Sequence, residues 1–359
     1  MDSRVFPDLF VLELANNHLG RLERGRRIVH DFGRVVRHNG VRAAIKLQIR
    51  NVETFIHPAF RDRTDLRYVR KTIETRLSPE DYAVLSEEIR RNNCLRMATP
   101  FDEASVDLCV ALDMDLLKLA SSDINDWPLI EKIATARKPV IASTGGSSLK
   151  DVDDLVRFFR NRGIPLALNH CVSIYPSEDE ELQLNQIDFL RDRYPDNVIG
   201  FSTHERADWT LSIAIAYAKG ARTFERHIDI EADGAPVSPY CSRPEQIDAW
   251  FRAFRSAKAM CGGPGTEKRV PPRKEIEYLD ALVRGVYARK DLPAGRALEA
   301  GDYYLAIPLQ KGQISCRELV AGEVLLRDCP KDAPISIDML DSPYSRNPAL
   351  REQIEKRGL

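Results

Sequence analysis

The sequence lacks any long apolar run. No window approaches the roughly 20 continuous apolar residues that a membrane span needs. The first residues, MDSRVFPDLFVLELA, also lack a basic segment followed by an apolar run and a small-residue cleavage site. We therefore expect neither a membrane partner nor a secretory leader, and a cytoplasmic protein.

The chain has almost no net charge. Its 53 Lys and Arg residues are matched by 54 Asp and Glu residues, which gives a formal charge of −1. This balance provides no overall attraction to nucleic acid or to an anionic membrane surface. We expect no nucleic-acid partner.

Cysteine is sparse and scattered. The seven cysteines are odd in number and form no CxxC pair. This pattern argues against a disulfide framework and against a structural zinc site. Buried free thiols are the expectation.

Short apolar runs recur along the first two thirds of the 359 residues, with helical segments between them. Unalternated apolar strands separated by helices are typical of a parallel sheet that is covered on both faces. Eight such units predict an α/β fold of the (β/α)8 TIM-barrel type. The predicted strands are residues 9–15, 43–49, 95–101, 116–121, 139–144, 166–172, 197–203 and 223–228.

The composition changes after Met260, where CGGPGTEKRVPPRKE cannot continue a helix. A domain boundary is predicted there. The expected organisation is a barrel domain, a linker, a small β-rich module and a charged, fraying tail, at residues 1–262, 263–281, 282–340 and 341–359.

Polar side chains gather at the ends of the predicted strands, where barrels of this kind form their active sites. Two lysines, Lys46 and Lys118, lie inside apolar runs. A buried ammonium is costly without an anionic partner, so these lysines predict a bound anion, with a core carboxylate as the alternative. Nearby Ser and Thr hydroxyls and the Thr144-Gly145-Gly146 turn would cradle the oxygens of a small phosphorylated acid.

Two histidines, His204 and His227, end adjacent predicted strands. Two imidazoles with waters suit a divalent transition ion that acts as a Lewis acid, although core or loop histidines are the alternative. Glu13 and Glu225 lie inside strands, where each needs a lysine, a metal-bound water or a reacting group. A general base is one such role.

Taken together, these segments resemble the sialic acid (N-acetylneuraminate) synthase family, whose manganese-dependent enzymes condense phosphoenolpyruvate with N-acetylmannosamine-type sugars. The resemblance runs from about residue 9 to residue 340. It includes ELANNHLG, IKLQ, TPFD, LLKLASSDI, STGGSS, NHCVSIYPS, GFSTHE and FERHIDIE. The small module resembles the antifreeze-like (SAF) domain that closes this family's site, often from the partner subunit of a swapped homodimer.

The resemblance implies a role for each matching position. His204 and His227 would hold the metal, with Mn2+ expected and Mg2+ or Co2+ as alternatives. Tyr175 would lie on the acceptor side, and Glu13 and Glu225 would serve as catalytic residues together with the two lysines. The phosphoenolpyruvate-binding residues would be Lys46, Thr99, Lys118, Ser121, Ser143, Ser173 and Ser202.

Departures from the family pattern concentrate on the acceptor side. An expected aspartate is absent from Pro236-Val237-Ser238, and an arginine of the small module is replaced by Ile307. GFSTHE also lacks the aspartate that precedes the metal histidine in the family. Apolar residues in place of hydrogen-bonding groups select against a polyhydroxylated substrate, so we expect an acceptor other than plain N-acetylmannosamine.

A basic segment after the second predicted strand has two interpretations. A solvated helix face balanced by Asp62 and Asp65 is favoured, and a clamp for an anionic group of the acceptor is the alternative. Its cations are Arg61, Arg63, Arg67, Arg70 and Lys71.

The predicted activity is condensation of phosphoenolpyruvate with an aldehyde, which gives a 2-keto-3-deoxy acid and phosphate. The rivals are a metal-dependent aldolase of the same fold and an inactive paralogue that only binds the anion.

Overall fold

The computed structural model describes residues 3–232, 234–263, 265–318 and 320–359. The chain divides into two compact units, residues 1–262 and 263–359. None of the described helices is both long and apolar enough to cross a membrane. All seven cysteines are free, and only Cys261 and Cys316 are exposed.

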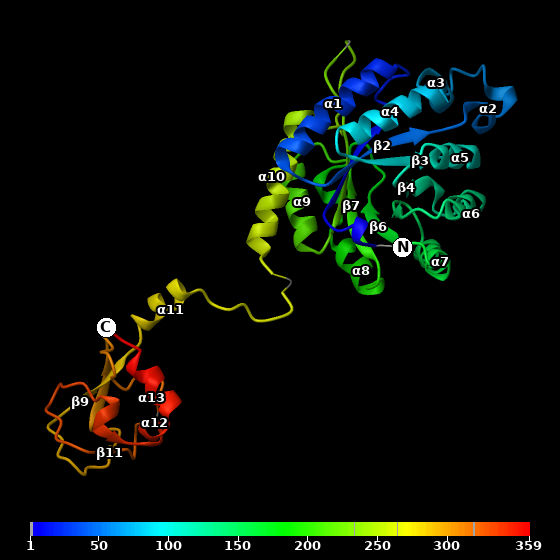
Figure 1. The fold of residues 1–359 in the computed structure, drawn as a ribbon. Coiled ribbons are helices and arrows are strands. Elements are labelled where there is room, and N and C mark those ends of the chain that lie inside the picture. Colours follow the sequence, from blue (N-terminus) through cyan, green and yellow to red (C-terminus); the bar gives the residue numbers. More distant parts are fainter. Residues whose placement is uncertain (1–2, 233, 264, 319) are drawn as a thin grey trace. The chain divides into compact units, whose positions relative to one another are not determined.

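The first unit is a closed barrel of eight parallel strands surrounded by helices (Figure 1), which confirms the predicted TIM barrel. The last strand pairs with the first, so that Leu9 lies beside Thr223 and Glu13 beside His227. The strands are β1 (Leu9–Ala15), β2 (Ala43–Ile49), β3 (Leu95–Pro100), β4 (Leu116–Leu119), β5 (Val140–Ser143), β6 (Leu166–Cys171), β7 (Val198–Thr203) and β8 (Thr223–His227).

Longer helices of this unit connect successive strands, and several short helical turns precede or follow them. They are η1 (Ser3–Val5), α1 (Leu22–Asn39), α2 (Val52–Phe55), η2 (Pro58–Phe60), α3 (Arg67–Glu74), α4 (Pro79–Arg91), α5 (Glu103–Ala111), η3 (Ser121–Asp123), α6 (Trp127–Thr135), α7 (Leu149–Asn161), η4 (Asp179–Glu181), α8 (Asn185–Arg193), α9 (Trp209–Ala218) and α10 (Pro244–Cys261).

The barrel wall has two faces because side chains alternate along each strand. On β1, Phe10 points outward and packs edge-on against Trp250, Phe251 and Phe254. The opposite face forms an interior cluster below the site, all of it buried. This cluster consists of Phe6, Leu9, Val11, Ala44, Met97, Leu116, Ile141 and Ala167.

Polar residues follow this apolar cluster at intervals of two along the same strands. Glu13 follows Val11, Lys46 follows Ala44, and Lys118 follows Leu116. A period of two keeps each pair on one face of the strand, so the interior changes from apolar to polar toward the carboxyl ends of the strands. The candidate site therefore lies at the carboxyl ends of the barrel strands.

The second unit has its own small core, in which two-stranded antiparallel sheets pack with short helices. Residues 263–281, expected as a linker, contain a helix. Residues 341–359 depart from the expected fraying tail, because they form helices and bury Ile354 in the core of the unit. The elements are α11 (Arg273–Asp280), β9 (Gly285–Ala288), β10 (Tyr303–Ala306), β11 (Val324–Leu325), η5 (Ile337–Met339), β12 (Leu340–Asp341), α12 (Pro343–Arg346) and α13 (Pro348–Glu355).

Candidate active site

A cavity of about 520 Å³ opens at the carboxyl ends of the barrel strands. We call it the reaction cavity. Every site residue that the sequence predicted lines it, although they come from all eight β/α units. These residues are Glu13, Lys46, Thr99, Lys118, Ser121, Ser143, Ser173, Tyr175, Ser202, His204, Glu225 and His227.

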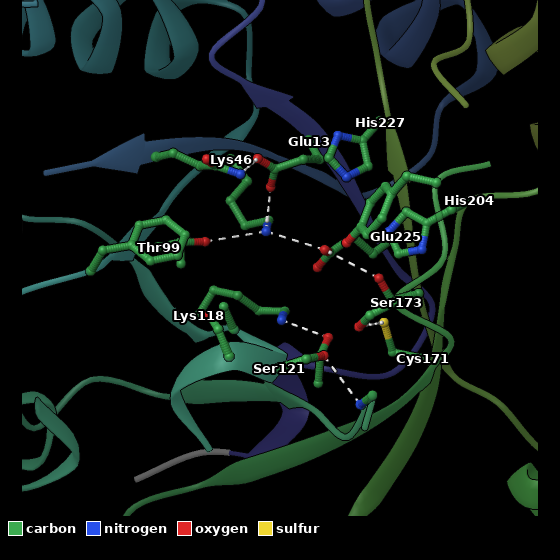
Figure 2. A pocket seen from close by; sticks show the side chains of 18 of the residues that line it. Glu13, Lys46, Thr99, Lys118, Ser121, Cys171, Ser173, His204, Glu225 and His227 are labelled. Atoms are coloured by element: carbon green, nitrogen blue, oxygen red, sulfur yellow. Dashed lines mark hydrogen bonds and ion pairs between the residues drawn. The ribbon is translucent and has the colours of Figure 1, made fainter. Parts of the chain in front are cut away.

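Lys46 is the centre of a buried charge network (Figure 2). Its ammonium forms ion pairs with Glu13 and with Glu225, the latter at 3.1 Å, and donates to Thr99 Oγ1 at 3.2 Å. The network follows from strand register, since Glu13 and Lys46 are partners across β1 and β2. Lys46 thus pairs with core carboxylates, as the alternative interpretation of the sequence expected.

The surroundings shift the pKa values of the two carboxylates in opposite directions. Burial raises the pKa of Glu13, which makes it the more readily protonated of the two. Burial alone would also raise the pKa of Glu225, but Lys46 and Lys118 together hold it below the usual range. Glu13 Oε2 contacts the Lys46 ammonium, whereas Oε2 of Glu225 has neither a hydrogen bond nor an ion-pair partner among the described residues.

Lys118 has a different environment from Lys46. It is 2% exposed and donates to Ser143 Oγ at 2.6 Å and to the carbonyl oxygen of Leu119 at 3.0 Å. Among the described residues, no carboxylate lies within ion-pairing distance of it. Burial lowers its pKa, which is the expected effect of a buried cation without a close counter-ion. Lys118 is thus the cation that an incoming anion would neutralise.

Hydroxyl groups and a glycine turn surround the lysines. Ser121 Oγ accepts a hydrogen bond from the backbone N–H of Gly145 at 3.1 Å. A Cβ atom at Gly145 would lie 2.3 Å from Ser173 Oγ and 2.9 Å from Ser121 Oγ, so only glycine leaves these hydroxyls in place. The turn after β5 therefore brings backbone and hydroxyl donors to one side of the cavity.

The two histidines face the same part of the cavity, with ring centroids 5.3 Å apart (Figure 2). His204 Nδ1 lies 2.9 Å from the carbonyl oxygen of Val172. Because a carbonyl oxygen only accepts, Nδ1 carries the proton, and Nε2 of the neutral ring keeps a free lone pair. Burial lowers the pKa of His204 to about 4 and that of His227 well below its usual value. Both rings are therefore neutral, the form that binds metals.

The described residues contain no cluster of three or more His, Cys, Asp or Glu side chains suited to a metal ion. The donor set for a metal here is the two imidazoles, with Glu225 nearby. The aromatic ring of Tyr175 covers His204, with ring centroids 4.0 Å apart, and is itself half exposed. Tyr175 thus lies against the histidines while remaining accessible to solvent.

Several lining residues were not among the predicted site residues. Gln48 Nε2 donates to Glu13 Oε1 at 3.1 Å, and Arg50 donates to Gln48 Oε1 at 3.2 Å. Arg50 is two residues beyond Gln48, so the alternation of side chains along β2 could have predicted that Arg50 also faces the cavity. Tyr68 and Phe101 lie on α3 and after β3, and nothing in their local sequence distinguishes them.

The basic segment 61–71 is divided between two environments. Arg63 forms an ion pair with Asp65 on the exposed surface, as the favoured interpretation expected, although both residues precede α3 and do not form a helix face. Arg67 and Lys71 instead line a second cavity that adjoins the reaction cavity. The acceptor-side departures at Val237 and Ser238 line neither cavity in the described part of the chain.

Known proteins resemble this chain over most of its length. The model of the NeuB family matches residues 37–265, more than half of the chain. A crystal structure from Chromobacterium violaceum, assigned as spore coat polysaccharide biosynthesis protein E, has 38% sequence identity and a TM-score of 0.87. It covers 94% of this chain and 100% of its own.

Two curated relatives carry enzyme names. The N-acetylneuraminate-9-phosphate synthase of Drosophila melanogaster is 26% identical over 79% of this chain and 77% of its own. The N,N'-diacetyllegionaminic acid synthase of Legionella pneumophila is 26% identical over 83% of this chain and 85% of its own.

Proposed function

The chain belongs to the NeuB family, and from this membership and the reaction cavity we propose that it condenses phosphoenolpyruvate with a sugar-like aldehyde. The products would be a 2-keto-3-deoxy acid and inorganic phosphate. The observation that carries the proposal is Lys118, a buried cation that is surrounded by hydroxyl donors and has no carboxylate within ion-pairing distance among the described residues. The synthase names of the curated relatives support the same reaction class.

Phosphoenolpyruvate would bind between the two lysines. Its carboxylate or phosphate would give Lys118 the anionic partner that no described residue provides. These groups would also compete with Glu13 and Glu225 for Lys46. The remaining oxygens would accept hydrogen bonds from hydroxyls at the ends of five strands. These hydroxyls belong to Thr99, Ser121, Ser143, Ser173 and Ser202.

His204 and His227 would hold a divalent metal, because both present neutral imidazoles to one part of the cavity. We propose Mn2+, with Mg2+ or Co2+ as alternatives. When bound, the ion would polarise the acceptor aldehyde as a Lewis acid. The unpartnered Oε2 of Glu225 fits a role beside the ion or its water.

In the proposed reaction, C3 of phosphoenolpyruvate forms a bond to the aldehyde carbon, and the aldehyde oxygen takes up a proton. Water then adds to C2, and the C–O bond to phosphate breaks. Glu13 is the candidate for the proton transfers because burial raises its pKa and Gln48 orients it. Lys46 and Lys118 would stabilise the charge that develops on phosphate and carboxylate oxygens.

Tyr175 would contact the acceptor. Its ring lies against both histidines, 4.0 Å from His204 and 5.9 Å from His227 between centroids, and the residue is half exposed. An acceptor whose aldehyde reaches the histidines would pack against this ring.

The family resemblance also supports two proposals about organisation. Residues 282–340 would be an antifreeze-like (SAF) domain, and the working protein would be a homodimer. Light scattering on the full chain tests the second proposal, and a monomer at assay concentrations would contradict it.

The deciding experiment measures phosphate release from phosphoenolpyruvate with Mn2+ across a panel of aldehydes. The panel contains N-acetylmannosamine, its 6-phosphate, other hexoses, pentose phosphates and short acidic aldehydes. Turnover with at least one acceptor, lost in Lys118→Met, is the expected result. Calorimetry that detects no phosphoenolpyruvate binding would overturn the proposal and favour an aldolase, whereas binding without any turnover would favour an inactive anion-binding paralogue.

A further inference from the structure

A second cavity, of about 370 Å³, adjoins the reaction cavity. We call it the basic cavity. The two share Gln48, Arg50, Tyr68, Phe101, Tyr175 and His227 in their walls. Beyond this shared wall, the basic cavity is lined by Arg67 and Lys71, and no Asp or Glu of the described chain lines it.

The three cations of the basic cavity come from two elements. Arg50 follows the end of β2, whereas Arg67 and Lys71 are four residues apart on α3. A spacing of four places both side chains on the same face of that helix. Two separate elements therefore direct positive charge at one volume.

These cations differ from their basic neighbours in having no carboxylate partner. Arg63 pairs with Asp65 at 2.6 Å, and Arg76 pairs with Glu53 at 2.8 Å. In the described part of the chain, no Asp or Glu oxygen lies within ion-pairing distance of Arg50, Arg67 or Lys71.

The guanidinium of Arg50 is held in place by its surroundings. Its Cζ lies 3.6 Å from the ring centroid of Phe101, and it donates to Gln48 Oε1. This anchoring leaves the remaining N–H donors of a planar fork for a ligand. Partial burial, Arg50 and Arg67 all lower the pKa of Lys71, which shows mutual repulsion that an anion would relieve.

We propose that the basic cavity binds an anionic group of the acceptor, a phosphate or a carboxylate, at the end remote from the aldehyde. This inference rests on the proposed function, which places the aldehyde near His227 and Tyr175. Because both residues also line the basic cavity, an acceptor that extends from the histidines would carry its far end toward Arg50, Arg67 and Lys71. The acceptor class is thus an acidic sugar or sugar phosphate.

The test is calorimetry on the full chain, saturated with phosphoenolpyruvate and free of metal so that no turnover occurs. The probes are N-acetylmannosamine, its 6-phosphate, its 6-carboxylate and inorganic phosphate. We expect the 6-phosphate or the 6-carboxylate to bind at least about tenfold tighter than the neutral sugar, because hydrogen bonds to a charged group are stronger than those between neutral groups. The stronger of the two identifies the anion.

The variants Arg67→Ala and Lys71→Ala should each remove most of this preference, while Arg63→Ala, a paired arginine outside both cavities, should retain it. Equal binding of charged and neutral sugars, or no binding of any anionic probe, would overturn the inference even when phosphoenolpyruvate binds. Failure of phosphoenolpyruvate itself to bind would instead count against the proposed function. Anionic preference that survives both alanine variants would also reject the basic cavity as its source.

Discussion

Glu13 and Lys46 are partners across β1 and β2, and their side chains form an ion pair that is 1% and 5% exposed. Glu225 joins the same ammonium from β8. Lys118, on β4, donates to a hydroxyl and to a carbonyl oxygen instead. The two lysines thus carry the same charge, but within the described chain only Lys46 neutralises buried carboxylates.

Lys46→Met should destabilise the folded chain more than Lys118→Met. Removing Lys46 leaves two buried carboxylates without their cation, a change that costs about 3–5 kcal/mol of unfolding free energy. Removing Lys118 breaks no buried ion pair and should change stability little. Urea unfolding at pH 7 measures the difference, and both variants should lose phosphate release. Equal stabilities would contradict the charge network described here.

Metal removal should abolish phosphate release. We expect a chelator to inactivate the protein and Mn2+ to restore it, because the ion would supply several kcal/mol of charge stabilisation. His204→Ala should lower the rate at least about a hundredfold at saturating Mn2+, whereas His30→Ala, on the exposed face of α1, should match the wild type. Full activity in thoroughly chelated protein would rule out the metal role.

His18 should make stability depend on pH. It is fully buried, its Nδ1 accepts from the N–H of Gly20, and burial lowers its pKa from 6.5 to about 4. Between these values the unfolded chain binds a proton that the folded chain does not, so stability falls as the pH drops from 6.5 to 4, by up to about 3 kcal/mol.

His18→Gln should flatten this part of the stability curve relative to the wild type. His30→Gln should leave it unchanged because His30 is solvent exposed. Urea titrations at several pH values provide the comparison. An unaltered slope in His18→Gln would show that other groups account for the pH dependence.

Gly145→Ala should weaken phosphoenolpyruvate binding by about tenfold, because overpacking costs roughly 1–3 kcal/mol and the new Cβ would displace Ser173 Oγ. Gly146→Ala is the matched control. Its Cβ would meet nothing within 4 Å, so its backbone strain at φ +69° should affect stability rather than affinity. Calorimetry with phosphoenolpyruvate distinguishes the two variants. Tighter binding by Gly145→Ala than by Gly146→Ala would contradict a role for the Gly145 turn and its neighbouring hydroxyls in binding.

Much of the barrel was predictable because each strand carries its own signal. Predominantly apolar runs such as residues 43–49 match β2 at both ends, and the polar residues within or just after these runs identify the cavity lining. Strand alternation is local information, and closure of the barrel then brings local features together.

The remaining features depend on contacts that sequence spacing does not encode. Lys46 and Lys118 look alike in the sequence, yet only Lys46 meets carboxylates, since this depends on the register between strands. Arg63 and Arg67 likewise look alike in the sequence, yet Arg63 lies before α3 and pairs with Asp65, whereas Arg67 lies on α3 and lines the basic cavity. The last residues of the chain are strongly charged, and the burial of a single side chain, Ile354, is what places α13 in the core.

The apolar cluster beneath the polar layer forms a region of low dielectric constant. Leu9, Val11, Ala44 and Leu116 fill the barrel interior on the side of the lysines away from the cavity, and each is fully buried. The charge of Lys118, which has no carboxylate within ion-pairing distance among the described residues, is therefore screened by water from one direction only, and its field extends toward the mouth of the cavity rather than across the barrel. A small anion that approaches this mouth would be attracted before it touches any side chain, so its association rate should decrease as the salt concentration rises.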